Sequence, residues 1–454
     1  MDLYGPLFRG ILLPLWEGGL KRRPTVRLWR ELERSQWLSI EALRARQAEE
    51  LRRLMAHTWA HVPFYRDRWE GAGQAPGDIR SPDDLRKLPI FTSADLRGTQ
   101  ETRSSTASPL PTIKKTTGGS TGRPLEFGFD DLSERWRLAV KMRGYQWSGY
   151  RPGDRALHFW GSLPVKRSAA QLRKIRLDRL LRRDHYFDCG RVDDAVLATV
   201  VDGIRRLQPR AIVCYSQAGA ALARYVVEQR ARSWDPIPVI CGAETLTPGD
   251  RTVLEQAFGP GVYETYGCRE VMLIAAECPA HAGMHVSMEN LVVELVVREG
   301  GSERPAQPGE IGEVVLTDLH NYGMPFVRYA NGDLAVAAPP GRCECGRELP
   351  RLERVEGRVT ETLRDGAGRR VNGLLFNIVL TALSTGVRQW QVVQHRDGSV
   401  TLKVVPTAGL DESMRRRVLD ATSKYLSGVP VRLEVVAEIP TSPAGKRPLV
   451  CVER

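Results

Sequence analysis

The side chains with the clearest chemical potential lie in a short segment that is rich in glycine and hydroxyl residues. The segment consists of Thr116, Thr117, Gly118, Gly119, Ser120, Thr121 and Gly122. Because glycine permits unusual backbone conformations and close approach, such a segment can bring N–H and hydroxyl donors around phosphate oxygens. It is not a Walker A loop, since Arg123 and Pro124 follow the last glycine where that motif requires lysine and then serine or threonine. A flexible surface loop is the other interpretation that the segment alone leaves open.

Three further segments offer the other groups that a nucleotide requires. They contain Gly242, Ala243 and Glu244 after an apolar strand, then Tyr266, Gly267, Arg269 and Glu270 in an aromatic turn, and finally Asp333 after a tight turn. Ligands of α/β sheets favour the carboxyl ends of strands, where the first of these segments is expected. A nucleotide needs a flat apolar face for its base and carboxylates for its ribose hydroxyls and for Mg²⁺. The four segments together therefore favour nucleotide binding.

Near the end of the sequence, Lys446 lies in a turn shaped by Pro443 and Gly445. A positioned ammonium group offsets the negative charge that develops when a carboxylate attacks a phosphate. From the local sequence alone, a solvated lysine in a turn is equally admissible.

The eight cysteines do not form the disulfide framework of a small secreted protein. Cys278, His285 and the pair Cys343 and Cys345 have residue types suited to a tetrahedral zinc site, because soft thiolates favour Zn²⁺. Reduced thiols and a histidine in unrelated loops are the alternative that spacing alone leaves open.

Strands that alternate with helices must position these groups. Buried strands are expected at residues 155–160, 211–215 and 237–241, with helices at 41–59, 130–145 and 218–230. This alternation predicts an α/β domain with a largely parallel sheet, and strands at 291–297 and 312–317 predict a more β-rich later part.

After Arg354 the pattern changes to that of a compact α+β unit. We expect a hairpin at residues 360–371, a strand pair at 389–394 and 400–405, a helix at 412–426 and a strand at 431–436. The predicted division is a domain of residues 1–355 and a smaller domain of residues 356–454.

The composition excludes several classes of protein. The chain has 454 residues, of which 42% are hydrophobic, and its net charge of +12 comes mostly from arginine. This charge gives modest help to anionic ligands, but no basic-aromatic module indicates nucleic-acid binding. No apolar run is long enough to span a bilayer, and no secretory signal is recognisable, so a cytoplasmic location is expected.

Two segments carry surface features. The apolar residues 3–16 precede the basic Lys21, Arg22 and Arg23, which would suit a membrane surface. A packed N-terminal arm is favoured instead, because Pro6 and Pro14 should break a continuous helix. The arginine-rich residues 173–183 predict a solvated helix.

Taken together, the motifs resemble those of the adenylate-forming acyl-ligase superfamily. The chain is most similar to the phenylacetate–CoA ligase-like group, in the branch associated with capsular polysaccharide biosynthesis. The resemblance covers nearly the whole chain and includes residues 54–65, 149–154 and 317–329. It implies an α/β fold with a large N-terminal domain and a small, mobile C-terminal α+β domain that carries Lys446.

The resemblance also implies a role for each motif. The segment Thr116 to Gly122 would surround the ATP phosphates, and Gly242, Ala243 and Glu244 would line the adenine beside Tyr266 and Gly267. Glu270 would hold Mg²⁺, Asp333 would bind the ribose hydroxyls, and Arg358 would reach the nucleotide from just after a hinge. Lys446 would bridge the substrate carboxylate and the α-phosphate. Some members of the group carry zinc in the corresponding loops, so a structural Zn²⁺ bound by Cys278, His285, Cys343 and Cys345 is expected.

The implied reaction is ATP-dependent activation of a small carboxylic acid as an acyl-adenylate, followed by acyl transfer, most often to CoA. Arg269 stands where the superfamily usually has threonine or serine, and we interpret it as a substitute phosphate contact. Thr360 replaces an acid that is common after the hinge, which leaves the acceptor open between CoA and an amine or hydroxyl group. Adenylyl transfer and an inactive nucleotide-binding scaffold are further alternatives, and a homodimer also stays open.

Overall fold

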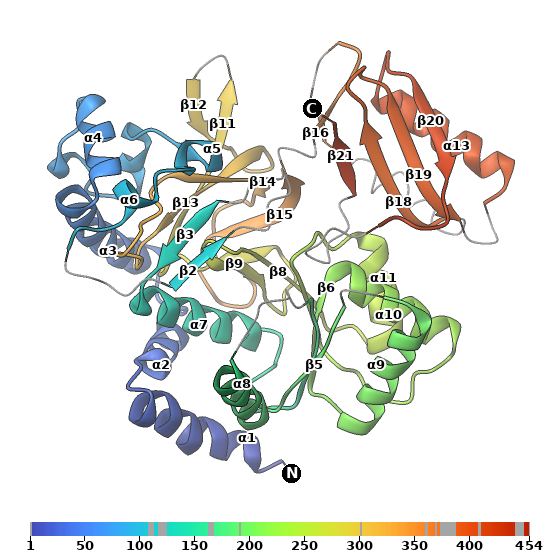
Figure 1. Ribbon diagram of the computed structural model, residues 1–454, viewed down its shortest axis with the longest axis horizontal. Coiled ribbons are helices and arrows are strands. Elements are labelled where there is room, and N and C mark those ends of the chain that lie inside the picture. Colours follow the sequence, from blue (N-terminus) through green and yellow to red (C-terminus); the bar gives the residue numbers. More distant parts are fainter. Residues whose placement is uncertain are drawn as a thin grey trace.

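The computed structural model describes the chain in eleven stretches (Figure 1). These are residues 2–107, 113–116, 125–161, 168–189, 192–299, 302–358, 362–367, 370–372, 387–406, 410–440 and 449–453. The predicted α/β fold is confirmed, because helices and strands alternate around one large sheet.

The first half of the large sheet is parallel, as the sequence predicts. Its strands are β4 (Ala156–Phe159), β5 (Asp184–Phe187), β6 (Ala211–Tyr215), β7 (Val239–Gly242) and β8 (Val262–Cys268), in the order β5-β4-β6-β7-β8. Every residue of β4, β6 and β7 is buried. Strands with both faces covered read as unbroken apolar runs, which explains why sequence alone located these three.

The second half is antiparallel and continues from β8. It contains β9 (Met272–Glu277), β10 (Met284–Val286), β11 (Leu291–Glu299), β12 (Ser302–Pro305), β13 (Ile311–Asp318), β14 (Tyr329–Ala337) and β15 (Arg351–Arg358). The order is β12-β11-β13-β14-β15-β10-β9-β8, and β1 (Phe91–Thr92) pairs with β14. A separate hairpin joins β2 (Ile113–Thr116) to β3 (Glu126–Phe129).

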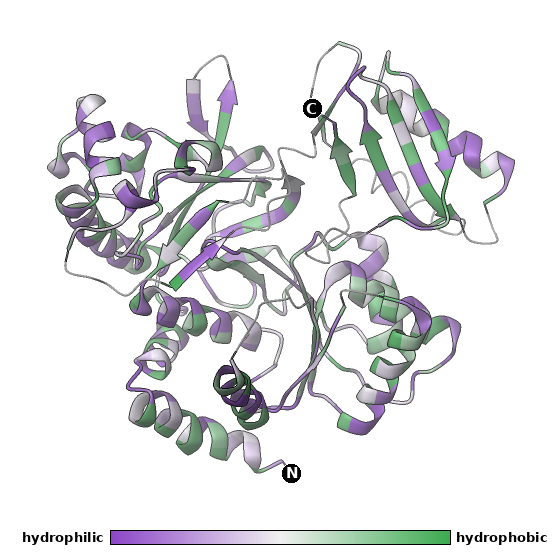
Figure 2. Ribbon diagram, viewed as in Figure 1, coloured by the Kyte–Doolittle hydropathy of each residue, from purple (hydrophilic) through white to green (hydrophobic). Residues whose placement is uncertain are grey.

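Helices cover the faces of the sheet. They are α2 (Thr25–Ser35), α3 (Ile40–His61), α4 (Pro63–Gly71), α5 (Ser93–Leu96), α6 (Gln100–Arg103), α7 (Asp131–Gln146), α8 (Ala169–Arg182), α9 (Asp194–Leu207), α10 (Ser216–Glu228) and α11 (Pro248–Phe258). Asp130 caps α7 by accepting from the Ser133 amide at 2.8 Å, and its other oxygen accepts from the amides of Tyr322 and Gly323. This carboxylate therefore fixes α7 to the loop that leads into β14. Figure 2 shows hydrophobic residues concentrated along the central strands.

The last part of the chain has its own sheet and its own core. Strands β18 (Val387–Gln394), β19 (Val400–Pro406), β20 (Val431–Val435) and β21 (Val450–Val452) pair in the order β20-β19-β18-β21, beside α13 (Glu412–Tyr425). A short hairpin, β16 (Thr362–Arg364) and β17 (Arg370–Asn372), precedes them. The apolar cluster of this unit draws its buried members from residues 363–450 alone. The predicted elements are confirmed, while the division into residues 1–355 and 356–454 stays a prediction.

The N-terminal arm corrects one expectation. Residues Tyr4–Leu20 are helical despite both prolines, as α1 (Tyr4–Leu7) followed by the π-helical segments Phe8–Leu12 and Leu15–Leu20. Pro6 lies in the first turn, where its missing N–H donor costs nothing, and the wider π turns beside Pro14 relieve the lost hydrogen bond. Phe8 and Leu13 are buried in the main core, which contributes roughly 1.5–3 kcal/mol each. The expected packed arm is confirmed, but the expectation that Pro6 and Pro14 break the helix is wrong.

Among the described residues, no helix combines the length and the apolar character that crossing a membrane requires.

Candidate functional site

Tyr266 and Asp333 meet at one edge of the large sheet. The hydroxyl of Tyr266, on β8, donates to Oδ2 of Asp333, on β14, at 2.8 Å. Asn331 donates to the same carboxylate at 2.7 Å and to the tyrosine oxygen at 2.9 Å. Strands β8 and β14 are separated in the sheet by β9, β10 and β15, so the sheet must bend to bring their ends together. Two residues predicted to contact one nucleoside are thus in direct contact.

Burial raises the pKa of Tyr266 well above its ordinary value, and the neighbouring Asp333 raises it further. The phenol therefore remains a hydrogen-bond donor at neutral pH. This fixes Asp333 as the acceptor in the pair, with its Oδ2 facing both Tyr266 and Asn331. A carboxylate held in this way suits recognition of a diol such as ribose.

Glu270 lies in the turn that joins β8 to β9, with its side chain buried. The hydroxyl of Tyr329, at the start of β14, donates to Oε1 of Glu270 at 2.9 Å. Burial raises the pKa of Tyr329 far above its ordinary value, so the phenol stays a donor. Arg269, one residue earlier, is exposed. The turn therefore presents a fixed carboxylate and a solvent-facing guanidinium next to each other.

Tyr329 is a residue that sequence reasoning missed. It ends the segment 317–329 that contributes to the family resemblance, but the sequence indicates no role for its side chain. The contact with Glu270 joins positions 59 residues apart, which no local pattern can indicate.

Close steric contacts explain why two positions in these motifs require glycine. A Cβ atom at Gly242 would lie 2.6 Å from Oγ1 of Thr265, which itself donates to the Cys241 carbonyl at 2.8 Å. A Cβ atom at Gly267 would collide with the carbonyl oxygen of Met272, at an irregular pairing of β8 and β9. Ala243 has φ of +67°, in the left-handed region. The backbone is thus held close and in a sharp turn where β7 and β8 end.

Glu244 makes a contact that the sequence did not indicate. Its Oε2 accepts from the Gln217 amide at 3.1 Å, in the first turn of α10, and its carbonyl accepts from Ser216 at 2.8 Å. A carboxylate is favourable there because the first amides of a helix lack partners within the helix. Glu244 thus anchors the β7 loop to α10, and its contact with adenine stays a prediction.

Two predicted parts of the site fall partly or wholly outside the described residues. Thr117 to Gly122 lie there, as does Lys446. Thr116 is the last residue of β2 and pairs with Glu126 of β3, so the strands that flank the glycine-rich segment are placed. Arg358 is the last residue of β15, and its backbone pairs with that of Asp333.

Lys115 adds a cation at the base of the glycine-rich segment. Its amine lies 4.7 Å from the centre of the Phe129 ring. Partial loss of hydration around its amine lowers the pKa of Lys115, although the residue is exposed, and the nearby guanidinium groups of Arg137 and Arg269 lower the pKa further. Positive charge therefore gathers where phosphate groups are expected. The sequence signal was the pair Lys114 and Lys115 directly before Thr116.

The predicted zinc ligands come together. One donor atom from each of Cys278, His285, Cys343 and Cys345 lies within 4.8 Å of the other three. The sulfurs of Cys278 and Cys343 are 3.8 Å apart, close to the roughly 3.8 Å edge of a tetrahedron with Zn–S bonds of about 2.3 Å. His281, in the same loop, instead faces Glu277 at 3.1 Å.

The orientation of His285 suits a metal ligand. Its Nδ1 donates to the Leu349 carbonyl at 3.2 Å, while its Nε2 lies 3.3 Å from the Cys345 sulfur. A backbone acceptor on one ring nitrogen is the usual way to direct the other toward a metal. Burial lowers the pKa of His285 to about 4, so the ring is neutral, as ligation requires. The chemistry of the donor set fits Zn²⁺.

A second carboxylate, the half-buried Glu264, lies two residues before Tyr266. Burial raises the pKa of Glu264 to about 7, opposed by a hydrogen bond from the Leu246 amide and reinforced by Glu277. Because the folded protein favours the protonated form of Glu264, the contribution of this residue to the free energy of unfolding is largest at low pH. It decreases as pH rises from the ordinary carboxyl pKa towards about 7.

We therefore expect Glu264→Gln to match the parent near pH 5 and to exceed its stability by about 2 kcal/mol near pH 8. Urea unfolding at both pH values measures the difference. The control is Gln256→Ala, at an exposed position of α11, which changes no titratable group and should keep the pH dependence of the parent. Equal dependence on pH in the Glu264 variant and the parent would contradict the assignment.

Curated proteins and solved structures resemble this chain along most of its length. No family model matches the chain. Phenylacetate-coenzyme A ligase of Thermus thermophilus is 28% identical over 377 residues, which cover 79% of this chain and 80% of that protein. Protein CapK of Staphylococcus aureus is 23% identical over 385 residues, which cover 80% of this chain and 79% of that protein.

Among solved structures, 2-hydroxyisobutyryl-CoA ligase in its postadenylation state has a TM-score of 0.74 at 22% identity. The match covers 93% of this chain and 92% of that one. The same ligase in its thioesterification state has a TM-score of 0.61 over 93% of this chain. This likeness shows the fold.

The curated relatives agree with this chain along most of both chains, and the fold is shared with solved CoA ligases. These findings support placing the chain in the phenylacetate–CoA ligase-like group of the adenylate-forming ligases.

Proposed function

We propose that the chain activates a small carboxylic acid with ATP, giving an acyl-adenylate and pyrophosphate, and then transfers the acyl group to CoA. The observation that carries the proposal is the group formed by Tyr266, Asp333 and Glu270 at one sheet edge. It offers a carboxylate on β14 for ribose and a separate buried carboxylate for Mg²⁺ in the turn that follows β8.

In this proposal each residue has a distinct task in the first step. A carboxylate oxygen of the acid attacks the α-phosphorus of ATP, and pyrophosphate leaves with the electron pair of the broken P–O bond. Asp333 holds the ribose, and Glu270, oriented by Tyr329, holds Mg²⁺, which supplies positive charge to the phosphate oxygens. Arg269 and Lys115 supply further positive charge beside the glycine-rich segment, and Lys446 bridges the attacking carboxylate and the α-phosphate.

The second step needs a different arrangement of the same chain. We propose that residues 356–454 form a lid that carries Lys446 into the site and then withdraws it. In support, the chain resembles the postadenylation state of 2-hydroxyisobutyryl-CoA ligase more than its thioesterification state, although both matches cover 93% of the chain. Because the two matches cover equal shares of the chain, the lower TM-score supports a different arrangement of the large domain and the C-terminal unit in the thioesterification state of that ligase.

In that second step the acceptor sulfur attacks the acyl carbonyl, AMP leaves, and the thiol proton is released. CoA is favoured as acceptor because phenylacetate-coenzyme A ligases are among the relatives of this chain, one of them at 28% identity. An amine or hydroxyl acceptor is the second candidate, since the segment after Arg358 departs from the pattern of CoA ligases at Thr360.

The test is acid-dependent exchange of labelled pyrophosphate into ATP across a panel of aromatic, hydroxylated and short-chain acids. The proposal expects exchange with at least one acid, followed by a thioester when CoA is added. ATP binding without exchange for any acid would favour the inactive scaffold. Exchange that yields product only with an amine or hydroxyl acceptor would select the second candidate.

We also propose that Cys278, His285, Cys343 and Cys345 hold one structural Zn²⁺. Four protein ligands leave no open coordination position, so the ion would stabilise the fold without taking part in the reaction. Cys343 and Cys345 lie between β14 and β15, and Cys278 and His285 flank the turn between β9 and β10. The ion would thus tie together two loops of the antiparallel half of the sheet.

Purified protein should contain about one equivalent of zinc, and Cys343→Ser should lose it. The free energy of unfolding should fall by about 3–4 kcal/mol, which a ligand at 100 to 1,000 times its Kd contributes. Metal analysis and urea unfolding measure the two effects. Cys451→Ser is the control and should keep its zinc; a zinc-free parent whose stability is unchanged by a chelator would contradict the site.

A further inference from the structure

The outward face of the N-terminal helical arm carries no charge. Its exposed residues between positions 3 and 20 are leucine, isoleucine, proline and glycine only: Leu3, Pro6, Leu7, Gly10, Ile11, Leu15, Gly18, Gly19 and Leu20. The five large side chains among them are between 46% and 77% exposed. Leu3, Leu7, Ile11 and Leu15 repeat every four residues, which places them along one side of a helix. The opposite side is anchored in the main core through Phe8 and Leu13.

Helix α8 lies beside this arm and is unusual because none of its residues is buried. Its exposed side chains combine Leu172, Leu177 and Leu180 with Arg173, Lys174, Arg176 and Arg179. Only Leu181 of this helix packs against the main core, and it is partly buried, so α8 derives little stability from the core. Apolar and cationic residues on one exposed helix are typical of segments that lie in a membrane interface.

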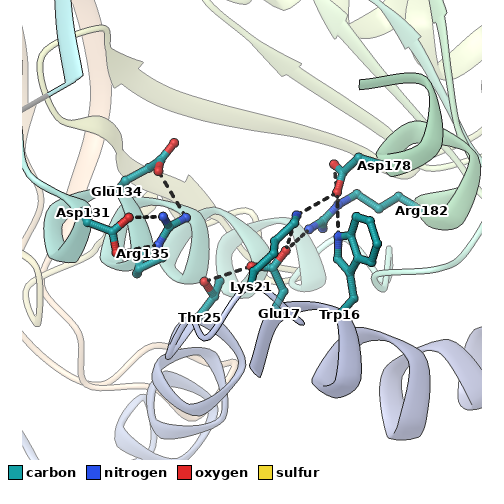
Figure 3. A network of polar contacts seen from close by, with 9 residues as sticks. All are labelled: Trp16, Glu17, Lys21, Thr25, Asp131, Glu134, Arg135, Asp178 and Arg182. Carbon is teal, nitrogen blue, oxygen red and sulfur yellow. Dashed lines mark hydrogen bonds and ion pairs between the residues drawn. The ribbon is translucent and has the colours of Figure 1, made fainter. Parts of the chain in front are cut away.

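Polar contacts join the arm and α8 into one rigid surface (Figure 3). Trp16 donates from its ring nitrogen to Asp178 of α8 at 3.1 Å, and Lys21 pairs with the same carboxylate at 3.3 Å. Glu17, buried in the arm, pairs with Lys21 at 3.0 Å and with Arg182 at 3.3 Å. Figure 1 shows the two helical segments next to each other at the same end of the molecule.

The charge of this surface is strongly unbalanced. Its acids, Asp2, Glu17 and Asp178, are each engaged by cations of the surface itself. In contrast, Arg22 of the arm and Arg173, Lys174, Arg176 and Arg179 of α8 have no carboxylate at ion-pair distance within the described parts of the chain. The surface thus offers cations without carboxylate partners next to exposed leucines, and one of these cations, Arg179, lies 3.8 Å from the centre of the Tyr186 ring. A lipid bilayer with anionic headgroups complements both features.

We propose that the arm and α8 form a docking surface for an anionic phospholipid bilayer. Leu7, Ile11 and Leu15 would enter the boundary between headgroups and acyl chains, while the cations of α8 and Arg22 bind lipid phosphates. The protein would lie on the membrane without crossing it. This proposal is independent of the ligase reaction, because none of these residues was assigned to the nucleotide or zinc site.

Sedimentation of the full chain with vesicles tests the proposal. Vesicles of equal parts phosphatidylglycerol and phosphatidylcholine should bind the chain about 10-fold or more tightly than phosphatidylcholine alone, and added salt should weaken this binding. Leu7→Glu with Ile11→Glu should lower binding by about 10-fold or more. Replacing Arg173, Lys174 and Arg176 by glutamine should lower it on the order of 100-fold.

Val227→Glu, at an exposed apolar position of α10, is the matched control and should bind as the parent does. All variants should keep acid-dependent pyrophosphate exchange, so that a loss of membrane binding can be distinguished from a loss of folding or of ligase activity. Equal binding to both vesicles, or none, would overturn the proposal. Self-association of the lipid-free chain that Leu7→Glu and Ile11→Glu abolish would also overturn it, because the face would then be an interface between copies.

Discussion

Replacing Lys446 by alanine is expected to reduce acid-dependent pyrophosphate exchange by about 10²–10³-fold. The variant loses the only cation proposed to contact both the attacking carboxylate and the α-phosphate. A charge held against a developing negative charge in a site that excludes water is worth far more than in solution. Steady-state exchange at saturating ATP and acid measures the loss, and the affinity for ATP should change little.

Lys403→Ala is the matched control, because Lys403 lies on β19 of the same C-terminal unit. It should keep near-parent exchange. The Lys446 variant should also still convert a supplied acyl-adenylate to the thioester, since the lysine is proposed to be withdrawn by then. Exchange unchanged in the Lys446 variant would refute its role, and loss of both half-reactions would indicate damage to the unit.

Glu270→Gln is expected to lower exchange by a similar factor, about 10²–10³-fold, and to raise the Mg²⁺ concentration required. The amide keeps the size of the side chain but removes the charge that binds the cation. Tyr329→Phe removes only the hydrogen bond to Glu270, so a loss of about threefold to tenfold is expected. Mg²⁺ titrations of both variants separate the two effects.

Tyr263→Phe is the control for Tyr329, since Tyr263 lies on β8 but its ring faces His281 instead of Glu270. It should behave as the parent does. A Tyr329 variant whose Mg²⁺ dependence is unchanged while its stability falls would show that Tyr329 only supports the fold.

The buried parallel strands could be predicted from sequence because their apolar runs are unbroken. Residues 211–215 were predicted at the bounds that β6 has. Strands β8 and β10 were missed, since β8 buries only Val262 and Tyr266 and β10 is short, so neither gives a comparable signal. The helical arm was missed because the proline rule assumes α geometry, and π turns satisfy the backbone differently.

The candidate site was predicted as a set of motifs, but its internal contacts could not be. The sequence placed Tyr266 and Asp333 in one site without indicating that they touch, since the contact depends on the bend of the whole sheet. The capping role of Glu244 likewise depends on where α10 begins relative to β7. The clustering of Cys278, His285, Cys343 and Cys345 was expected from the family resemblance, because residue types and spacing alone left unrelated thiols open.

The most direct test of carboxylate activation follows an oxygen atom. The chain is incubated with ATP, Mg²⁺, the acceptor and an acid that supports exchange, labelled with oxygen-18 in its carboxylate, and the products are weighed by mass spectrometry. If the carboxylate attacks the α-phosphorus, AMP will carry one oxygen-18 atom and pyrophosphate will carry none. Unlabelled AMP, or label in inorganic phosphate beside ADP, would contradict an acyl-adenylate and with it the proposed function.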